Sequence, residues 1–175
     1  GGMGSSREMF IESLVEPALI LAVFSQSLRY GTTALFALAG AHPVTVSAVV
    51  AGLALLLLTI AETSRVPVDN QETHLELTMV HEAMVLEYSG RSLALLEMAS
   101  YIKQAVLFVL IAQIAFPAAW PGVAGAILSY AARLAVVCVV VAMIEVSVAK
   151  MRLFRVADFL SFAFVLGIVA VVCAI

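Results

Sequence analysis

Charged residues are scarce in this chain: Asp, Glu, Lys and Arg make up 12% of its 175 residues. A soluble domain contains about 25% charged residues, so the low share excludes an ordinary water-soluble protein. Hydrophobic residues make up 63%, and the mean hydropathy is +1.11. The net charge is only -3 and no basic run occurs, which excludes a nucleic-acid-binding surface. The composition therefore predicts a polytopic membrane protein.

Cysteine is also nearly absent. Cys138 and Cys173 lie in separate aliphatic runs, so we expect apolar packing residues and no disulfide. No Cys-x-x-Cys pair is present to bind an iron–sulfur cluster. His81 and Glu82 begin like a zinc-protease motif, but its second histidine is missing. The chain also lacks a Ser–His–Asp set, a phosphate-binding glycine loop and a dinucleotide fingerprint. The sequence therefore predicts no metal site, no catalytic residue and no cofactor bound by this chain.

Five apolar segments approach the length of about 20 residues that a membrane-spanning helix needs. They cover residues 9–28, 44–61, 102–117, 123–146 and 156–175. The sequence thus predicts an all-α, polytopic membrane helix bundle that forms one domain with five transmembrane helices. Gly1 to Ser6, ahead of the first span, is expected to be a loop.

Residues 62–97, between the second and third spans, are rich in charge, and from Leu75 onward they have the pattern of an amphipathic helix. This stretch is either a sixth span or a long loop. The positive-inside rule favours the loop, because the opposite face then carries little basic charge beyond Arg29. Long loops in compact proteins are usually functional. We therefore expect a multi-pass protein of the prokaryotic cytoplasmic (inner) membrane, with this loop in the cytoplasm.

Two acidic groups in this loop are candidate sites. Glu62, Arg65 and Asp69 flank a proline, which cannot continue a helix. The span should therefore end there and free these side chains to face a pocket, although a helix stop with interfacial salt bridges explains the same residues. Glu76 and Glu87 share one helical face about three turns apart. They either relay protons through bridging waters or belong to the solvated face of an amphipathic helix.

Glu12, Glu16, Arg133 and Glu145 are ionisable residues inside the predicted spans. Such residues usually line ion routes or pair with one another. Arg133 and Glu145 lie about 18 Å apart along one helix at about 1.5 Å per residue, too far to pair. We therefore expect Arg133 to pair with Glu16. That pair either belongs to a polar path across the bilayer or fixes helix packing.

Residues 61–69, Ala-Glu-Thr-Ser-Arg-Val-Pro-Val-Asp, resemble the Ala-Glu-Thr-Asn-Arg-x-Pro-Phe-Asp signature of the first membrane subunit (subunit 1) of respiratory complex I. The Glu-Tyr-Ser-Gly at 87–90 is similar to a second motif of that family. Arg7 and Glu16 are nine residues apart, the same spacing as that of an Arg and a Glu in a further stretch of that family. The arginines at 152 and 155 resemble the pair in its last loop.

Three further stretches, 1–8, 73–84 and 153–156, resemble subunit 4 of formate hydrogenlyase and the equivalent subunits of energy-converting membrane-bound NiFe hydrogenases. Val68 departs from the Phe of the complex I motif, which favours this hydrogenase branch. The resemblance covers essentially the whole chain. Because the family has eight transmembrane helices, it implies that the five spans are the last five and that about three helices precede Gly1.

The resemblance implies a non-catalytic membrane anchor and coupling subunit of an energy-converting hydrogenase or formate hydrogenlyase-type complex. It would link redox chemistry in a peripheral arm to proton or sodium translocation. The implied partners are the hydrogenase large and small (iron–sulfur) subunits, which would hold the NiFe centre and the iron–sulfur clusters, antiporter-like membrane subunits and the lipid bilayer. The predicted ion pathway consists of Glu16, Glu62, Asp69, Glu76, Glu87, Arg133 and Glu145. The predicted docking surface for the peripheral arm consists of Arg7, Arg65, Glu72, His74, His81, Glu82, Arg91, Arg152 and Arg155.

Two other functions remain open. A quinone-site subunit of complex I (NADH:quinone oxidoreductase) belongs to the same superfamily and would bind a quinone. A stand-alone secondary transporter would use a buried Glu–Arg gate. The chain lacks the internal repeat of many transporter folds, and its long charged loop suits a docking surface.

Overall fold

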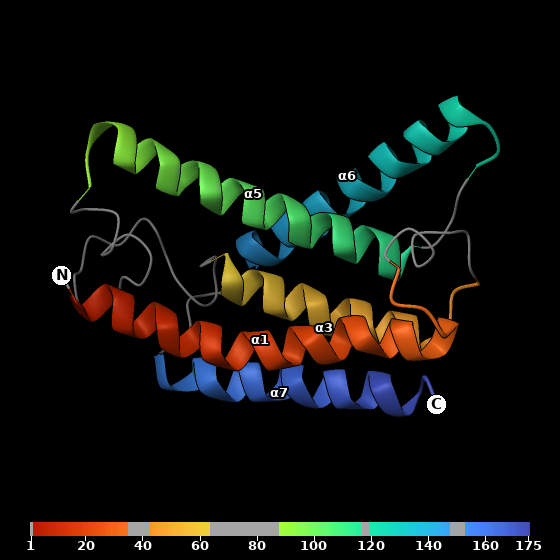
Figure 1. Ribbon diagram of the computed structural model, residues 1–175, viewed down its shortest axis with the longest axis horizontal. Coiled ribbons are helices and arrows are strands. Elements are labelled where there is room, and N and C mark those ends of the chain that lie inside the picture. The colour runs from red at the N-terminus through yellow and green to blue at the C-terminus, as the bar shows by residue number, and fades with distance from the viewer. Residues whose placement is uncertain (1, 35–42, 64–87, 117–119, 148–152) are drawn as a thin grey trace.

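The computed structural model describes residues 2–34, 43–63, 88–116, 120–147 and 153–175. All regular structure within these ranges is helical, and it forms five helices (Figure 1). They are α1 (Gly2–Tyr30), α3 (Val46–Glu62), α5 (Gly90–Ala115), α6 (Val123–Ser147) and α7 (Leu153–Val172). By length and composition, α1 from Met9 onward, α5 and α6 can each cross a membrane. The predicted all-α membrane helix bundle is confirmed.

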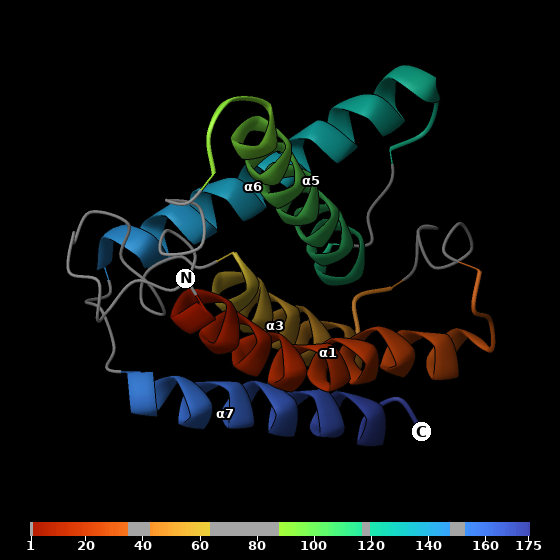
Figure 2. The ribbon, with the colours of Figure 1, turned by 60° about the vertical axis from the view of Figure 1, so that its left-hand side comes forward.

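α3 forms the centre of the bundle and contacts α1, α5 and α7. It begins where the hydroxyl of Thr45 accepts a hydrogen bond from the N–H of Ala48, a common N-terminal cap. Small side chains allow its neighbours to approach closely, as in many membrane bundles. The buried small residues of α3 are Ser47, Ala48, Ala51, Gly52, Ala54 and Ala61. The outermost helix is α6, which packs mainly against α5 (Figure 2).

The five helices do not all run in the same direction. α1, α5 and α7 run one way and α3 and α6 run the other (Figure 1). α1 and α7 are therefore parallel neighbours, and small residues line their contact: an added Cβ at Gly167 would lie 3.4 Å from the carbonyl oxygen of Ala18. The N-terminal half of α1, which contains Glu12, and the C-terminus of α3, which is Glu62, consequently lie toward the same end of the bundle, where α5 begins (Figure 1).

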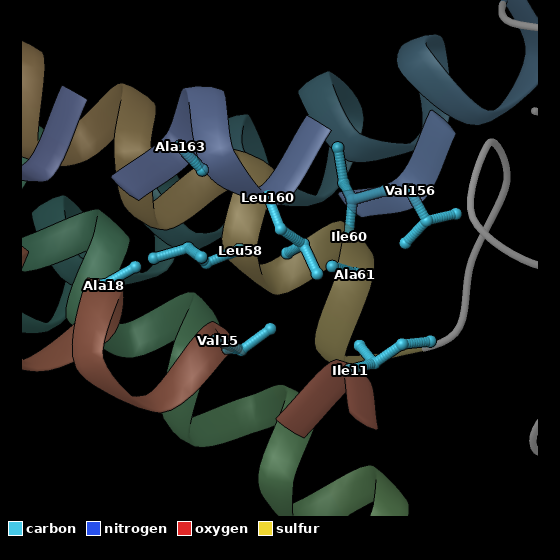
Figure 3. Close-up of a cluster of buried hydrophobic side chains, with 9 residues drawn as sticks. All are labelled: Ile11, Val15, Ala18, Leu58, Ile60, Ala61, Val156, Leu160 and Ala163. Atoms are coloured by element: carbon cyan, nitrogen blue, oxygen red, sulfur yellow. The ribbon is translucent and has the colours of Figure 1, made fainter. Parts of the chain in front are cut away.

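A cluster of buried apolar side chains joins α1, α3 and α7 near this end (Figure 3). Ile11 and Val15 from α1 face Leu58 and Ala61 from α3, and Leu160 from α7 closes the group. These side chains are almost fully buried. The cluster fixes the relative positions of the three helices and so of the polar residues next to it in the sequence.

The structure corrects three of the predictions. α1 already begins at Gly2, where a loop was expected, because the helix-forming segment from Arg7 onward extends backward and local propensity is only a weak constraint. α5 begins at Gly90, so the predicted loop 62–97 ends earlier. Most of residues 91–101 are good helix formers, but they are less apolar than the predicted span. Cys138 and Cys173 are free thiols but are exposed, and they are not packing residues of this chain.

The contact between Gly52 of α3 and Ala115 of α5 offers a test of the packing. A Cβ added at Gly52 would lie 2.9 Å from the Cβ of Ala115, closer than real Cβ atoms approach. Gly52→Ala is therefore expected to push the helices apart and cost about 1–2 kcal/mol of stability through overpacking. The measurement is the melting temperature of the detergent-solubilised protein. Gly52→Ala combined with Ala115→Gly should recover most of the loss, and an unstable double variant would contradict this explanation.

Candidate functional site

The candidate site is an ion-pair cluster in which one lysine bridges two glutamates from different helices. The ammonium of Lys103 on α5 donates to Oε1 of Glu62 on α3 at 2.9 Å and to Oε1 of Glu12 on α1 at 3.2 Å. The two glutamates are 41 and 91 positions from the lysine along the chain. The cluster therefore joins α1, α3 and α5 at a single charged point.

The directions of the Glu12 and Glu62 side chains follow from the burial of the residues that precede them. Ile11, which precedes Glu12, and Ala61, which precedes Glu62, both belong to the buried apolar cluster (Figure 3). Successive residues on a helix point about 100° apart, so burial of Ile11 and Ala61 turns the two carboxylates out of that cluster. Both then reach the ammonium of Lys103. The ion-pair cluster thus borders the apolar core directly.

Glu62 is the most enclosed member of the cluster. Its side chain is 15% exposed, against 41% for Glu12 and 39% for Lys103. Its Oε2 is buried and has no hydrogen-bond partner among the described residues. Glu62 is also the last residue of α3, and the negative end of a helix dipole disfavours a carboxylate there. Lys103 supplies a positive charge, which offsets the cost of enclosing the Glu62 carboxylate and the cost of its position at the negative end of the helix dipole.

The cluster carries more negative than positive charge. Two carboxylates and one ammonium give a formal charge of -1 when all three groups are ionised. Charge is costly to hold in an apolar environment, and Glu62 is the member of the cluster with the least access to water. Binding of one proton by either carboxylate makes the cluster neutral. The cluster therefore has one carboxylate more than its single ammonium can neutralise.

Arg133 lies in a second polar contact, formed by α5 and α6. Its guanidinium donates to Oε1 of Gln113 at 3.1 Å and to the carbonyl of Phe116 at 2.9 Å. Phe116 is the C-cap residue that follows the last residue of α5, so Arg133 caps that helix, where a positive charge is favourable. The predicted ion pair with Glu16 is wrong, because neutral acceptors take these hydrogen bonds. Gln113 is ten residues from Lys103, about 15 Å along α5, so the structure does not bring Arg133 into the ion-pair cluster.

The other described candidates are dispersed. Glu16 lies one turn beyond Glu12 on α1 and is exposed. Glu145 is half-buried on α6, and its neighbour Ile144 packs against the apolar cluster of Figure 3. Arg91 is exposed in the first turn of α5. Among the members of the predicted ion pathway that the structure describes, only Glu62 lies in the ion-pair cluster.

Several predicted site residues lie outside the described residues. In the pathway these are Asp69, Glu76 and Glu87; on the docking surface they are Arg65, Glu72, His74, His81, Glu82 and Arg152. Arg7 and Arg155 belong to α1 and α7, but their side chains are not described. The roles predicted for all of these residues stay predictions.

Side chains that could ligate a metal ion are scattered over the described ranges. Within these ranges, no three His, Cys, Asp or Glu side chains come together as they would around a metal ion. The ion-pair cluster has two carboxylates, and an ammonium already lies between them.

Lys103 is not among the predicted site residues, although the sequence contains a signal for it. It is the only lysine within a predicted span, since Lys150 lies between spans. Intramembrane ionisable residues are functional candidates by default, and that rule applied to the span 102–117 would have singled it out. Its position one residue from the predicted start made it resemble an ordinary interfacial lysine.

Comparison with known proteins places this chain in a family. The family model described as NADH dehydrogenase matches residues 1–175. Hydrogenase-4 component C of Escherichia coli (strain K12) is 34% identical over 122 residues, which cover 66% of this chain and 37% of that protein. The chain thus aligns with little more than a third of the length of this relative. No solved structure matches. Because the family model covers every residue, the chain belongs to the NADH dehydrogenase family.

Proposed function

We propose that this chain is the membrane anchor and coupling subunit of an energy-converting hydrogenase or formate hydrogenlyase-type complex. It links redox chemistry in a peripheral arm to ion translocation through its membrane-embedded acidic residues. The similarity to a hydrogenase component supports the type of complex. The ion-pair cluster of Glu12, Glu62 and Lys103 is the observation that carries the coupling role.

The cluster supports coupling because of where it lies. Glu62 ends α3, and the chain continues within three residues to Arg65, which belongs to the predicted docking surface. Ionisable groups at membrane depth are costly and usually functional. A protonatable cluster that directly precedes a docking segment is suitably placed to respond to electron transfer in a peripheral arm.

The helix directions support one orientation in the cytoplasmic membrane. α1, α5 and α7 all begin toward the end of the bundle at which α3 ends with Glu62 (Figure 1). Arg7, Arg91 and Arg155 occur near the starts of these three helices. The positive-inside rule assigns such an end to the cytoplasm, where a peripheral hydrogenase arm would dock.

Purification of the tagged protein in a mild detergent tests this function. We expect iron–sulfur and nickel-containing subunits and antiporter-like membrane subunits to co-purify, identified by mass spectrometry and metal analysis. Arg65→Ala should release the soluble subunits while the membrane subunits remain together, because it removes a charge from the docking surface. Purification of the unmodified chain alone would contradict the proposal and favour a stand-alone transporter.

The family description supports a second candidate, a quinone-site subunit of an NADH dehydrogenase complex. The same purification separates the two. A hydrogenase-type complex produces or consumes hydrogen and is indifferent to added quinone. A complex that oxidises NADH and reduces a quinone would establish the second candidate.

A further inference from the structure

The ion-pair cluster contains its own cation. The ammonium of Lys103 contacts Oε1 of both Glu12 and Glu62, so it occupies the space between the carboxylates. A lysine ammonium offers three donors and no acceptor. Any second cation at this point would have to displace it or bind to the remaining oxygens.

The remaining oxygens are poor ligands for a metal cation. Hard cations are held by a shell of several oxygen ligands, and a sodium ion shares that requirement. Oε2 of Glu62 is buried and has no hydrogen-bond partner among the described residues. A metal cation bound to this oxygen or to the second oxygen of Glu12 would also lie beside the Lys103 ammonium, and the two positive charges would repel each other. A proton needs only one lone pair of one oxygen.

We propose that Lys103 is the resident counter-cation of Glu12 and Glu62 and restricts these two carboxylates to the exchange of protons, excluding sodium ions. This inference rests on the proposed function, because it names the ion that the ion-pair cluster handles. Lys103 thereby determines ion specificity at this point of the chain.

The exchange is balanced in protons and charge. A proton bound by the more exposed Glu12 forms an O–H bond and leaves Lys103 paired with Glu62. Transfer of that proton to Glu62 restores the Glu12 anion, and the ammonium then pairs with Glu12. One proton enters and one leaves, while Lys103 keeps its own three hydrogens. The lysine is thus a positioning residue that shifts between two carboxylates.

Labelling with dicyclohexylcarbodiimide tests the proposal, because carbodiimides modify protonated carboxyl groups in membranes. Membranes that contain the assembled complex are treated in sodium chloride or in choline chloride at equal ionic strength. The modified peptides are then quantified by mass spectrometry. We expect Glu12 or Glu62 of the unaltered protein to be labelled equally in both salts.

Two lysine variants identify the cause. In Lys103→Gln the space between the carboxylates is open to a metal cation, so sodium should lower the labelling severalfold. In the matched control Lys103→Arg a cation remains, and sodium should have no effect. A failure of sodium to protect Lys103→Gln would show that the lysine is not what excludes sodium and would overturn the assignment.

The unaltered protein alone can also refute the proposal. Protection of its carboxylates by sodium, or absence of labelling at both, would overturn it whether or not the variants assemble. The proposed function fails separately, because it depends on the subunits that co-purify. Sodium-independent labelling of a chain that purifies alone would leave the specificity of the ion-pair cluster intact.

Discussion

Glu62→Gln in the assembled complex is expected to lower proton translocation about a hundredfold, the lower end of what a positioned acid–base group contributes. The amide keeps an oxygen that can accept the hydrogen bond of Lys103 but cannot take up and release a proton. The three helices should therefore stay joined and the complex should stay assembled. The measurement is proton movement per hydrogen molecule in inverted membrane vesicles, with subunit composition checked on the same sample.

Glu97→Gln is the matched control for this variant. Glu97 is an exposed acid on α5, six residues before Lys103, and lies outside the ion-pair cluster. Its replacement makes the same change of charge and should leave proton translocation unaltered. An assembled Glu62→Gln complex that translocates protons normally would exclude Glu62 from the ion pathway.

Lys103→Met is expected to cause the largest loss of stability among single substitutions in the ion-pair cluster. It leaves Glu62 enclosed and without a cation, at the unfavourable end of a helix dipole. Breaking a fully buried ion pair costs about 3–5 kcal/mol, and the partial exposure of Glu12 and Lys103 reduces our expectation to about 2–3 kcal/mol. The melting temperature of the solubilised protein is the measurement.

Removal of all three charges of the ion-pair cluster is expected to recover part of this loss of stability. Lys103→Met combined with Glu12→Gln and Glu62→Gln removes every charge of the cluster, so no carboxylate is left uncompensated. The triple variant should be more stable than Lys103→Met alone, because a buried unpaired charge costs more than a neutral replacement. A triple variant less stable than the single one would show that lost contacts outweigh lost charge compensation.

Hydropathy and helix-breaking residues were sufficient to predict the helices. The four uncharged turns before Glu62 and the proline at 67 located the end of α3 closely, and the structure ends that helix at Glu62. The start of α5 was misplaced because residues 90–101 are helical without being strongly apolar. The length of the apolar segments therefore predicted the apolar part of each helix better than the residues at which the helix begins and ends.

The ion-pair cluster could not be predicted from spacing, since its glutamates are 41 and 91 residues from Lys103 and meet it only through packing of α1, α3 and α5. The prediction for Arg133 failed for a related reason. It assumed that a membrane-embedded guanidinium needs a carboxylate, whereas the free carbonyl at the end of α5 and the amide of Gln113 satisfy it. The last carbonyl groups of a helix are free to accept hydrogen bonds. A prediction that considers only charged residues as partners does not include them.

The last turn of α3 has a consequence for how movement could reach Glu62. That turn is closed at the Thr59 carbonyl, which accepts both the N–H and the hydroxyl of Thr63, at 3.0 and 2.7 Å. Helix termini fray more readily than the buried middles of helices. Glu62 therefore lies at the part of α3 that unwinds most easily, although α3 is the central helix of the bundle. Unwinding by a single turn would withdraw the carboxylate from the ammonium while leaving the rest of α3 in place.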